Sequence, residues 1–214
     1  TKIGGGSLTL AGANTYTGST TVNGGTLIAG SNNAFGSSQS MAIAAGATVD
    51  LNGFSQTFSS IGGTGTVALN GGATLTIGAG GTTSSLGVSL TGSGNLTKDG
   101  SGTVTLDGSN SYTGATSVLD GTLRAGNATA FGGSHTLNVS STGSLVLNAF
   151  QASFSSVASS GAIDLNGATL IVGADGSSST IGGTIQGNGG LTKIGSGVLT
   201  LSGFNAYTGP TFAQ

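Results

Sequence analysis

The sequence is first defined by what it lacks. Its 214 residues contain no cysteine, no tryptophan and no glutamate, with one proline and one methionine. Without cysteine there is no disulfide framework, which suits either a reducing cytosol or a chain that must cross an oxidising periplasm. The strong helix formers Glu, Lys, Arg and Met are nearly absent and glycine occurs 44 times, so a helical fold is excluded.

Charge is equally scarce. Only 5% of the residues are charged and the formal net charge is −2, against a usual charged share of about 25%. Such a chain has no basic patch to hold a phosphate backbone, so we expect no nucleic-acid partner. The sequence contains no run of 18 apolar residues, so it predicts no membrane-spanning helix. The N-terminal TKIGGG has no apolar core and no initiating Met, so we expect either a removed leader or a piece of a longer protein.

What the chain does contain is a regular β pattern. Hydrophobic residues make up 36% of the sequence and alternate with Thr and Ser in short segments such as SLTLAG, GTLIAG and ATLTIG, each closed by glycine. We predict an all-β, right-handed parallel β-helix (β-solenoid). Coils of roughly 20–24 residues, spaced about 4.8 Å apart, give about nine or ten coils. Asn-Gly and Asp-Gly pairs also signal hairpins, which leaves an antiparallel meander as the alternative.

One phrase recurs three times along the chain. TKIGGGSLTLAGANTYTG at 1–18 returns as TKDGSGTVTLDGSNSYTG at 97–114 and as TKIGSGVLTLSGFNAYTG at 192–209. We therefore predict a super-repeat of about 96 residues, each copy holding several coils. The chain 1–214 is then a single solenoid segment with copies 1–96 and 97–191 and a partial third copy 192–214.

Nine residues mark structural repeat positions at the end of this phrase. We interpret the tyrosines as corner residues that cover the core while the hydroxyl reaches water or backbone; sugar-binding platforms are the alternative. The asparagines suit a left-handed turn and could also bond between coils. The nine positions are Asn14, Tyr16, Gly18, Asn110, Tyr112, Gly114, Asn205, Tyr207 and Gly209.

The remaining polar residues do not assemble into a site. Lys2, Lys98 and Lys193 share one repeat position and look like surface charges that discourage pairing at a strand edge. No two of the six Asp occupy the same repeat position. His135 is the single histidine, so neither a zinc site nor a His-based triad can form within the chain. We expect no enzyme activity, no catalytic or metal residues and no cofactor.

GNLTKDGSGTVTLDGSNSYTGATSVLDGTLRAG at 94–126 resembles the autotransporter-associated β-strand repeat, and 1–30 and 191–214 fit the same pattern. The resemblance implies a β-helical passenger domain of a bacterial type V secreted protein, displayed at the cell surface. It further implies that contact with the membrane runs only through a barrel domain of which this sequence shows no sign.

Three functions follow as expectations. The first is a rigid extracellular stalk that mediates adhesion or self-association, with a second copy (side by side or end to end), a host surface or a glycan as partner. The second is a fibre subunit that stacks head to tail. The third is a solenoid that binds ice, a crystal surface or a glycan, although Thr15/Thr17, Thr64/Thr66 and Thr74/Thr76 do not recur at one coil period.

Overall fold

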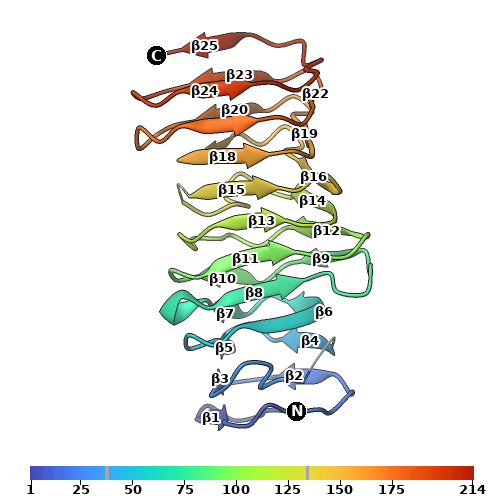
Figure 1. Cartoon of the computed structure of the whole chain (residues 1–214). Coiled ribbons are helices and arrows are strands. Elements are labelled where there is room, and N and C mark those ends of the chain that lie inside the picture. The colour runs from blue at the N-terminus through green and yellow to red at the C-terminus, as the bar shows by residue number, and fades with distance from the viewer. Residues whose placement is uncertain (37–38, 134) are drawn as a thin grey trace.

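The chain folds as a column of stacked coils, with the two termini at opposite ends (Figure 1). The computed structural model describes residues 1–36, 39–133 and 135–214. Strand pairing within these ranges is parallel throughout, which confirms the parallel β-solenoid and excludes the antiparallel meander. The longest sheet has ten strands, one per coil, so the solenoid makes about ten coils.

The described residues form four sheets that run along the column. The ten-stranded sheet contains β2 (Thr20–Val22), β4 (Gln39–Ile43), β6 (Gln56–Gly63), β8 (Thr74–Ile77), β11 (Asn95–Lys98), β13 (Thr116–Val118), β15 (Thr136–Val139), β18 (Ser156–Ser159), β21 (Ser179–Ile181) and β24 (Leu199–Leu201). The five-stranded sheet contains β1 (Ser7–Leu10), β3 (Thr26–Ala29), β5 (Thr48–Asp50), β7 (Thr66–Ala68) and β10 (Ser89–Thr91).

The other two sheets cover the middle and C-terminal coils. The six-stranded sheet contains β9 (Ser84–Leu86), β12 (Thr103–Leu106), β14 (Gly121–Ala125), β16 (Gly143–Val146), β19 (Ala162–Asp164) and β22 (Ile185–Gln186). The four-stranded sheet contains β17 (Ala152–Phe154), β20 (Thr169–Val172), β23 (Gly190–Lys193) and β25 (Thr211–Ala213). The 3-10 turn η1 (Asn70–Gly72) connects β7 to β8. In the described residues no helix is long and apolar enough to span a membrane.

The alternating sequence pattern produces this architecture directly. In β8 the side chains of Leu75 and Ile77 are buried while Thr74 and Thr76 face outward. Leu75 stacks on Leu96 of the next coil. Each such leucine removed from water contributes about 1.5–3 kcal/mol, and the parallel backbone hydrogen bonds hold one coil to the next.

Glycine permits the closest approach between coils. Gly108 follows β12, and a Cβ built there would lie 1.9 Å from the carbonyl oxygen of Val88 in the preceding coil. Because that oxygen belongs to backbone, the coils would have to separate to accept a methyl group. Gly12 holds the corresponding place in the first copy of the phrase, and a Cβ there would meet only Asn14 Oδ1 at 3.9 Å.

We therefore expect Gly108→Ala to lower the free energy of unfolding by about 2–3 kcal/mol, through overpacking against backbone. Urea unfolding followed by circular dichroism measures the change. Gly12→Ala is the matched control and should shift the midpoint little. Equal effects of the two substitutions would contradict the close-approach explanation.

Candidate functional site: the repeated corner

The three tyrosines form the same local contact in every copy. The Tyr112 hydroxyl is 2.7 Å from Thr116 Oγ1. The corresponding distances are 2.9 Å from Tyr16 to Thr20 and 2.6 Å from Tyr207 to Thr211. The hydroxyl partner is thus a threonine four residues later, rather than the water or backbone group expected from the sequence. The pair spans the corner and fixes the start of the next strand.

Tyr112 is enclosed by the fold. Its side chain is 0% exposed, whereas Tyr16 on the first coil is 38% exposed. Burial raises the pKa of Tyr112, so its hydroxyl stays protonated and can serve only as a hydrogen-bonding group. The strands that follow Tyr16 and Tyr112, β2 and β13, are separated in their sheet by β4, β6, β8 and β11. The tyrosines therefore do not form a continuous row for a sugar chain.

The glycines of the motif lie against the preceding coil. A Cβ at Gly114 would be 2.2 Å from the carbonyl oxygen of Gly94, and one at Gly209 would be 2.3 Å from that of Gly189. At Gly18, on the first coil, nothing lies within 4 Å. The requirement for glycine thus comes from the coil beneath.

The asparagines tie coils together through their side chains. Asn110 Oδ1 accepts a hydrogen bond from the Leu90 backbone N–H at 2.8 Å, twenty residues earlier in the sequence. Its Nδ2 donates to the Ala130 carbonyl at 2.7 Å, twenty residues later. One buried amide thus joins the coils on either side of its own, with both polar atoms satisfied in the interior.

The end copies each form one of these two cross-coil bonds. Asn14 Nδ2 donates to the Ala34 carbonyl in the following coil. Asn205 Oδ1 accepts from the Ile185 N–H in the preceding coil. The left-handed turn expected at these asparagines is wrong: positive φ occurs instead at asparagines such as Asn52 and Asn166. At this position the asparagine acts through its side-chain amide, which bonds to neighbouring coils, and not through a left-handed backbone conformation.

We expect Asn110→Ala to lower the free energy of unfolding by about 2–4 kcal/mol. The substitution leaves the Leu90 N–H and the Ala130 carbonyl buried without partners, and each costs about 1–3 kcal/mol. Denaturant titration measures the loss. Asn14→Ala, which removes one cross-coil bond from a half-exposed position, should cost about 1 kcal/mol. If Asn110→Ala were no worse than Asn14→Ala, the two-sided tie would not be the reason for the asparagine.

Two of the three lysines are buried rather than surface charges, which corrects the expectation from the sequence for Lys2 and Lys98, whereas Lys193 is partly exposed. Lys98 is 0% exposed, and Lys2 is also buried. Lys98 Nζ donates to the carbonyl oxygens of Asp99 at 3.2 Å and Gly100 at 2.5 Å, and to that of Asp120 in the next coil at 3.1 Å. The ammonium group therefore bonds to two carbonyls of its own turn and joins that turn to the next coil.

The same carbonyl cradle recurs at the other two lysines. Lys2 Nζ donates to the carbonyls of Ile3, Gly4 and Gly24. Lys193, in the last copy, donates to those of Ile194 and Gly195. Burial lowers the pKa of Lys98, and the negative charges of Asp120 and Asp99 oppose that shift.

A buried histidine packs beside the central corner. His135 Nε2 is 2.8 Å from Thr116 Oγ1, the same atom that meets the Tyr112 hydroxyl. Its ring lies 5.1 Å from that of Tyr112 and edge-on to Phe154 at 5.3 Å. Within the described part of the chain, Nδ1 has no hydrogen-bond partner. Apart from the rarity of histidine, no feature of the sequence pointed to this contact.

Across residues 1–36, 39–133 and 135–214, no group of three or more His, Asp or Glu side chains could hold a metal ion. The motif residues hydrogen-bond to backbone or to each other, so the arrangement as described stabilises the winding of coils.

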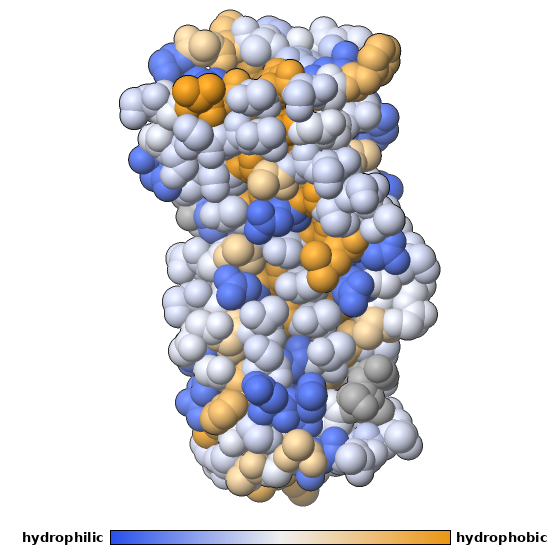
Figure 2. Space-filling view, in the orientation of Figure 1, coloured by the Kyte–Doolittle hydropathy of each residue, from blue (hydrophilic) through white to orange (hydrophobic). Residues whose placement is uncertain are grey.

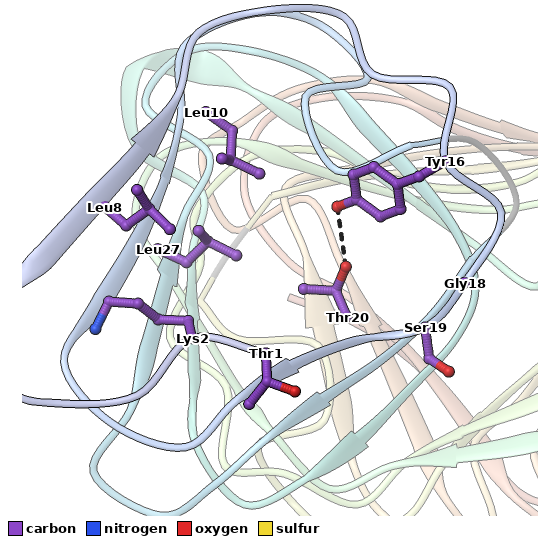
Figure 3. Close-up of a pocket in the computed structure, with 9 residues that line it drawn as sticks. All are labelled: Thr1, Lys2, Leu8, Leu10, Tyr16, Gly18, Ser19, Thr20 and Leu27. Atoms are coloured by element: carbon purple, nitrogen blue, oxygen red, sulfur yellow. Dashed lines mark hydrogen bonds between the residues drawn. The ribbon is translucent and has the colours of Figure 1, made fainter.

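An open hollow of about 320 Å³ lies at the N-terminal coil (Figure 3). Leu8, Leu10 and Leu27 line one side of it, and Tyr16, whose hydroxyl bonds to Thr20, lies on the other side. Leu8 is 44% exposed, whereas Val104, its counterpart in the second copy, is 2% exposed beneath a neighbouring coil. The hollow is therefore the solenoid core seen end-on, with an apolar lining that matches the inside of another coil.

Parts of the chain match a known family profile and a known protein. Three segments, 1–29, 96–125 and 191–213, match the family profile described as passenger-associated-transport-repeat. An alignment over 109 residues, which covers 48% of this chain and 3% of the relative, shows 41% identity to the adhesin BmaC autotransporter of Brucella suis biovar 1 (strain 1330). No solved structure matches.

Proposed function

Because the chain is an autotransporter passenger repeat protein, we propose that it forms a rigid stalk segment of a secreted bacterial surface adhesin. The observation that carries this proposal is the use of the motif residues. Asparagine, tyrosine, glycine and lysine at the repeated corners all contact neighbouring backbone or side chains within the rod. The repeated chemistry of the chain therefore serves length and stiffness.

We also propose a handedness for the coils and a length for the super-repeat. The coils wind in a right-handed sense, as crossovers between parallel strands nearly always do. The super-repeat of about 96 residues sets the distance between corners that carry the full Asn, Tyr and Lys set. Adhesion is then expected on the outer faces of the rod, because the corner side chains are engaged in its structure.

Cell-binding assays test the adhesive role. Beads coated with the chain, and uncoated beads as a control, are incubated with host epithelial cells and with a glycan array. The beads that stay bound are counted. Retention on cells or glycans above that of beads coated with an unrelated β-solenoid supports the proposal. Retention equal to that control would reduce the segment to a passive spacer.

A head-to-tail fibre is the second candidate, and the exposed apolar side chains of both end coils favour it. Leu8 lies at one end, and Phe204 and Phe212 lie at the other. A further coil, from the same protein or from a second copy, would cover either set. Light scattering of the pure chain between about 5 and 500 µM distinguishes the two sources, because only stacking of copies increases the mass with concentration.

A further inference from the structure

The outer face of the ten-stranded sheet carries an uncharged row of small side chains, all but one of them polar. Pairing places one outward residue of each strand directly above the next, from β6 to β24. The row, here called the hydroxyl row, consists of Thr57, Thr76, Thr97, Ser117, Asn138, Ala158, Thr180 and Thr200. The T-x-T pairs considered from the sequence alone did not reveal it, because it depends on which strands stack.

A second row borders it where the strands end. Lys98, Val118, Val139, Ser159, Ile181 and Leu201 lie in register, and the residue after each begins the turn. This edge row consists of Asp99, Leu119, Ser140, Ser160, Gly182 and Ser202. Leu119 is the one large apolar side chain in it and is 48% exposed.

A shallow open hollow of about 380 Å³ interrupts the same two rows. It lies two to three coils from Leu119 toward the C-terminus. Ala158 and Thr180 from the hydroxyl row line it, together with Ser160 and Gly182 from the edge row. Small residues at these positions leave the space that longer side chains would fill. The face toward the viewer in Figure 2 is largely pale, as expected for threonine, serine and glycine, with orange residues along the middle of the rod and patches of blue.

We propose that this face binds a second copy of the chain in antiparallel orientation, with Leu119 of each copy seated in the Ala158–Thr180 hollow of the other. The knob and the hollow share one edge of one face and are separated by roughly 12 Å along the axis, at about 4.8 Å per coil. A two-fold axis between the coils of Ser140 and Ser160 places Leu119 of each copy over the hollow of the other copy. Such a self-complementary contact is what an isologous dimer requires.

Charge favours this face over its neighbour. The two rows carry a single charge, Asp99, which the two-fold places opposite Gly182 and Ser202 of the partner, so no like charges meet. The corresponding outward row of the six-stranded sheet places Arg124, Val146 and Asp164 on consecutive strands. Charged side chains there would have to lose water on contact, which the hydroxyl row avoids.

The size of the face sets the expected strength. The two-fold leaves about 26 Å of the rows facing one another, and a strip of that length and about 15 Å wide buries roughly 400 Å² per copy, which is in the range of weak, transient interfaces. We expect a reversible dimer with a dissociation constant on the order of 10–100 µM, with Leu119 at its centre.

The inference deepens the adhesive function proposed above, and sedimentation velocity of the whole chain tests it separately. Between about 5 and 500 µM the chain should shift from monomer to dimer. Leu119→Asp should weaken dimerisation at least about tenfold, because a charge would enter the hollow. Val146→Asp, the same charge change on the six-stranded sheet, is the matched control and should dimerise normally. Circular dichroism verifies that both variants are folded.

Engineered cysteines test the orientation, which the cysteine-free sequence makes possible. Leu119→Cys combined with Ala158→Cys should form an intermolecular disulfide under mild oxidation, whereas Leu119→Cys alone should not. Cross-linking of Leu119→Cys alone would indicate a parallel pair and overturn the proposal. A monomer at every concentration would also overturn it, while bead adhesion to cells or glycans would leave the stalk function standing.

Discussion

Replacing Lys98 by methionine is expected to lower the free energy of unfolding by about 2–4 kcal/mol, because each carbonyl oxygen left without its hydrogen-bond donor costs about 1–3 kcal/mol. The methionine fills a similar volume, but it leaves three carbonyl oxygens, those of Asp99, Gly100 and Asp120, without their donor. Two of these belong to one turn and the third to the next coil. The loss therefore loosens both the turn and its attachment. Urea unfolding monitored by circular dichroism measures it.

Lys193→Met is the matched control for this prediction. Its ammonium group donates to two carbonyls, both in its own turn, and its side chain is partly exposed. Water can replace those bonds, so we expect a loss of about 1 kcal/mol or less. If the two substitutions had the same small effect, the carbonyl cradle would contribute little and Lys98 would be buried for another reason.

The second large effect is the dependence of stability on pH through His135. Burial lowers the pKa of this imidazole to about 4, and a backbone interaction with Gly133 opposes the shift only in part. In the unfolded chain the pKa is about 6.5. Below pH 6.5 the unfolded chain therefore takes up a proton that the folded chain refuses. The free energy of unfolding should fall by about 3 kcal/mol as the pH drops from 6.5 to 4.

The groups around the imidazole do not supply a compensating charge. Tyr112 and Thr116 are its polar neighbours, and both are neutral in this range. His135→Phe, which keeps an aromatic ring beside Phe154, should abolish most of the slope between pH 6.5 and 4. Denaturant midpoints of both proteins at half-unit pH intervals provide the comparison. An unchanged slope in the variant would assign the pH dependence to other groups.

The architecture could be predicted from the sequence because it depends on a local pattern. Alternation puts Leu75 and Leu96 inside and Thr76 and Thr97 outside, and glycine closes each coil. The same alternation also contained the signal for the buried lysine. In Asn95–Lys98 a buried Leu96 and an outward Thr97 place Lys98 inward. The surface interpretation gave more weight to the usual exposure of lysine than to its position in the strand.

Contacts between coils could not be predicted in the same way. The partners of Asn110 lie twenty residues away on either side, and only the register of stacking identifies them. The hydroxyl row was missed for the same reason: Thr57, Thr76 and Thr97 align because their strands pair. The super-repeat of about 96 residues stays a prediction, since stacking is organised coil by coil.

The amide of Asn110 also bears on how the rod comes apart. Stacked repeats are usually described as a one-dimensional array in which each unit is coupled only to its immediate neighbours. A side chain that bonds to the coil before and the coil after its own strengthens both interfaces of that coil at once. Fraying that advances from an end should therefore pause at such a coil. Amide hydrogen exchange would then rise in steps along the chain, with boundaries near residue 110.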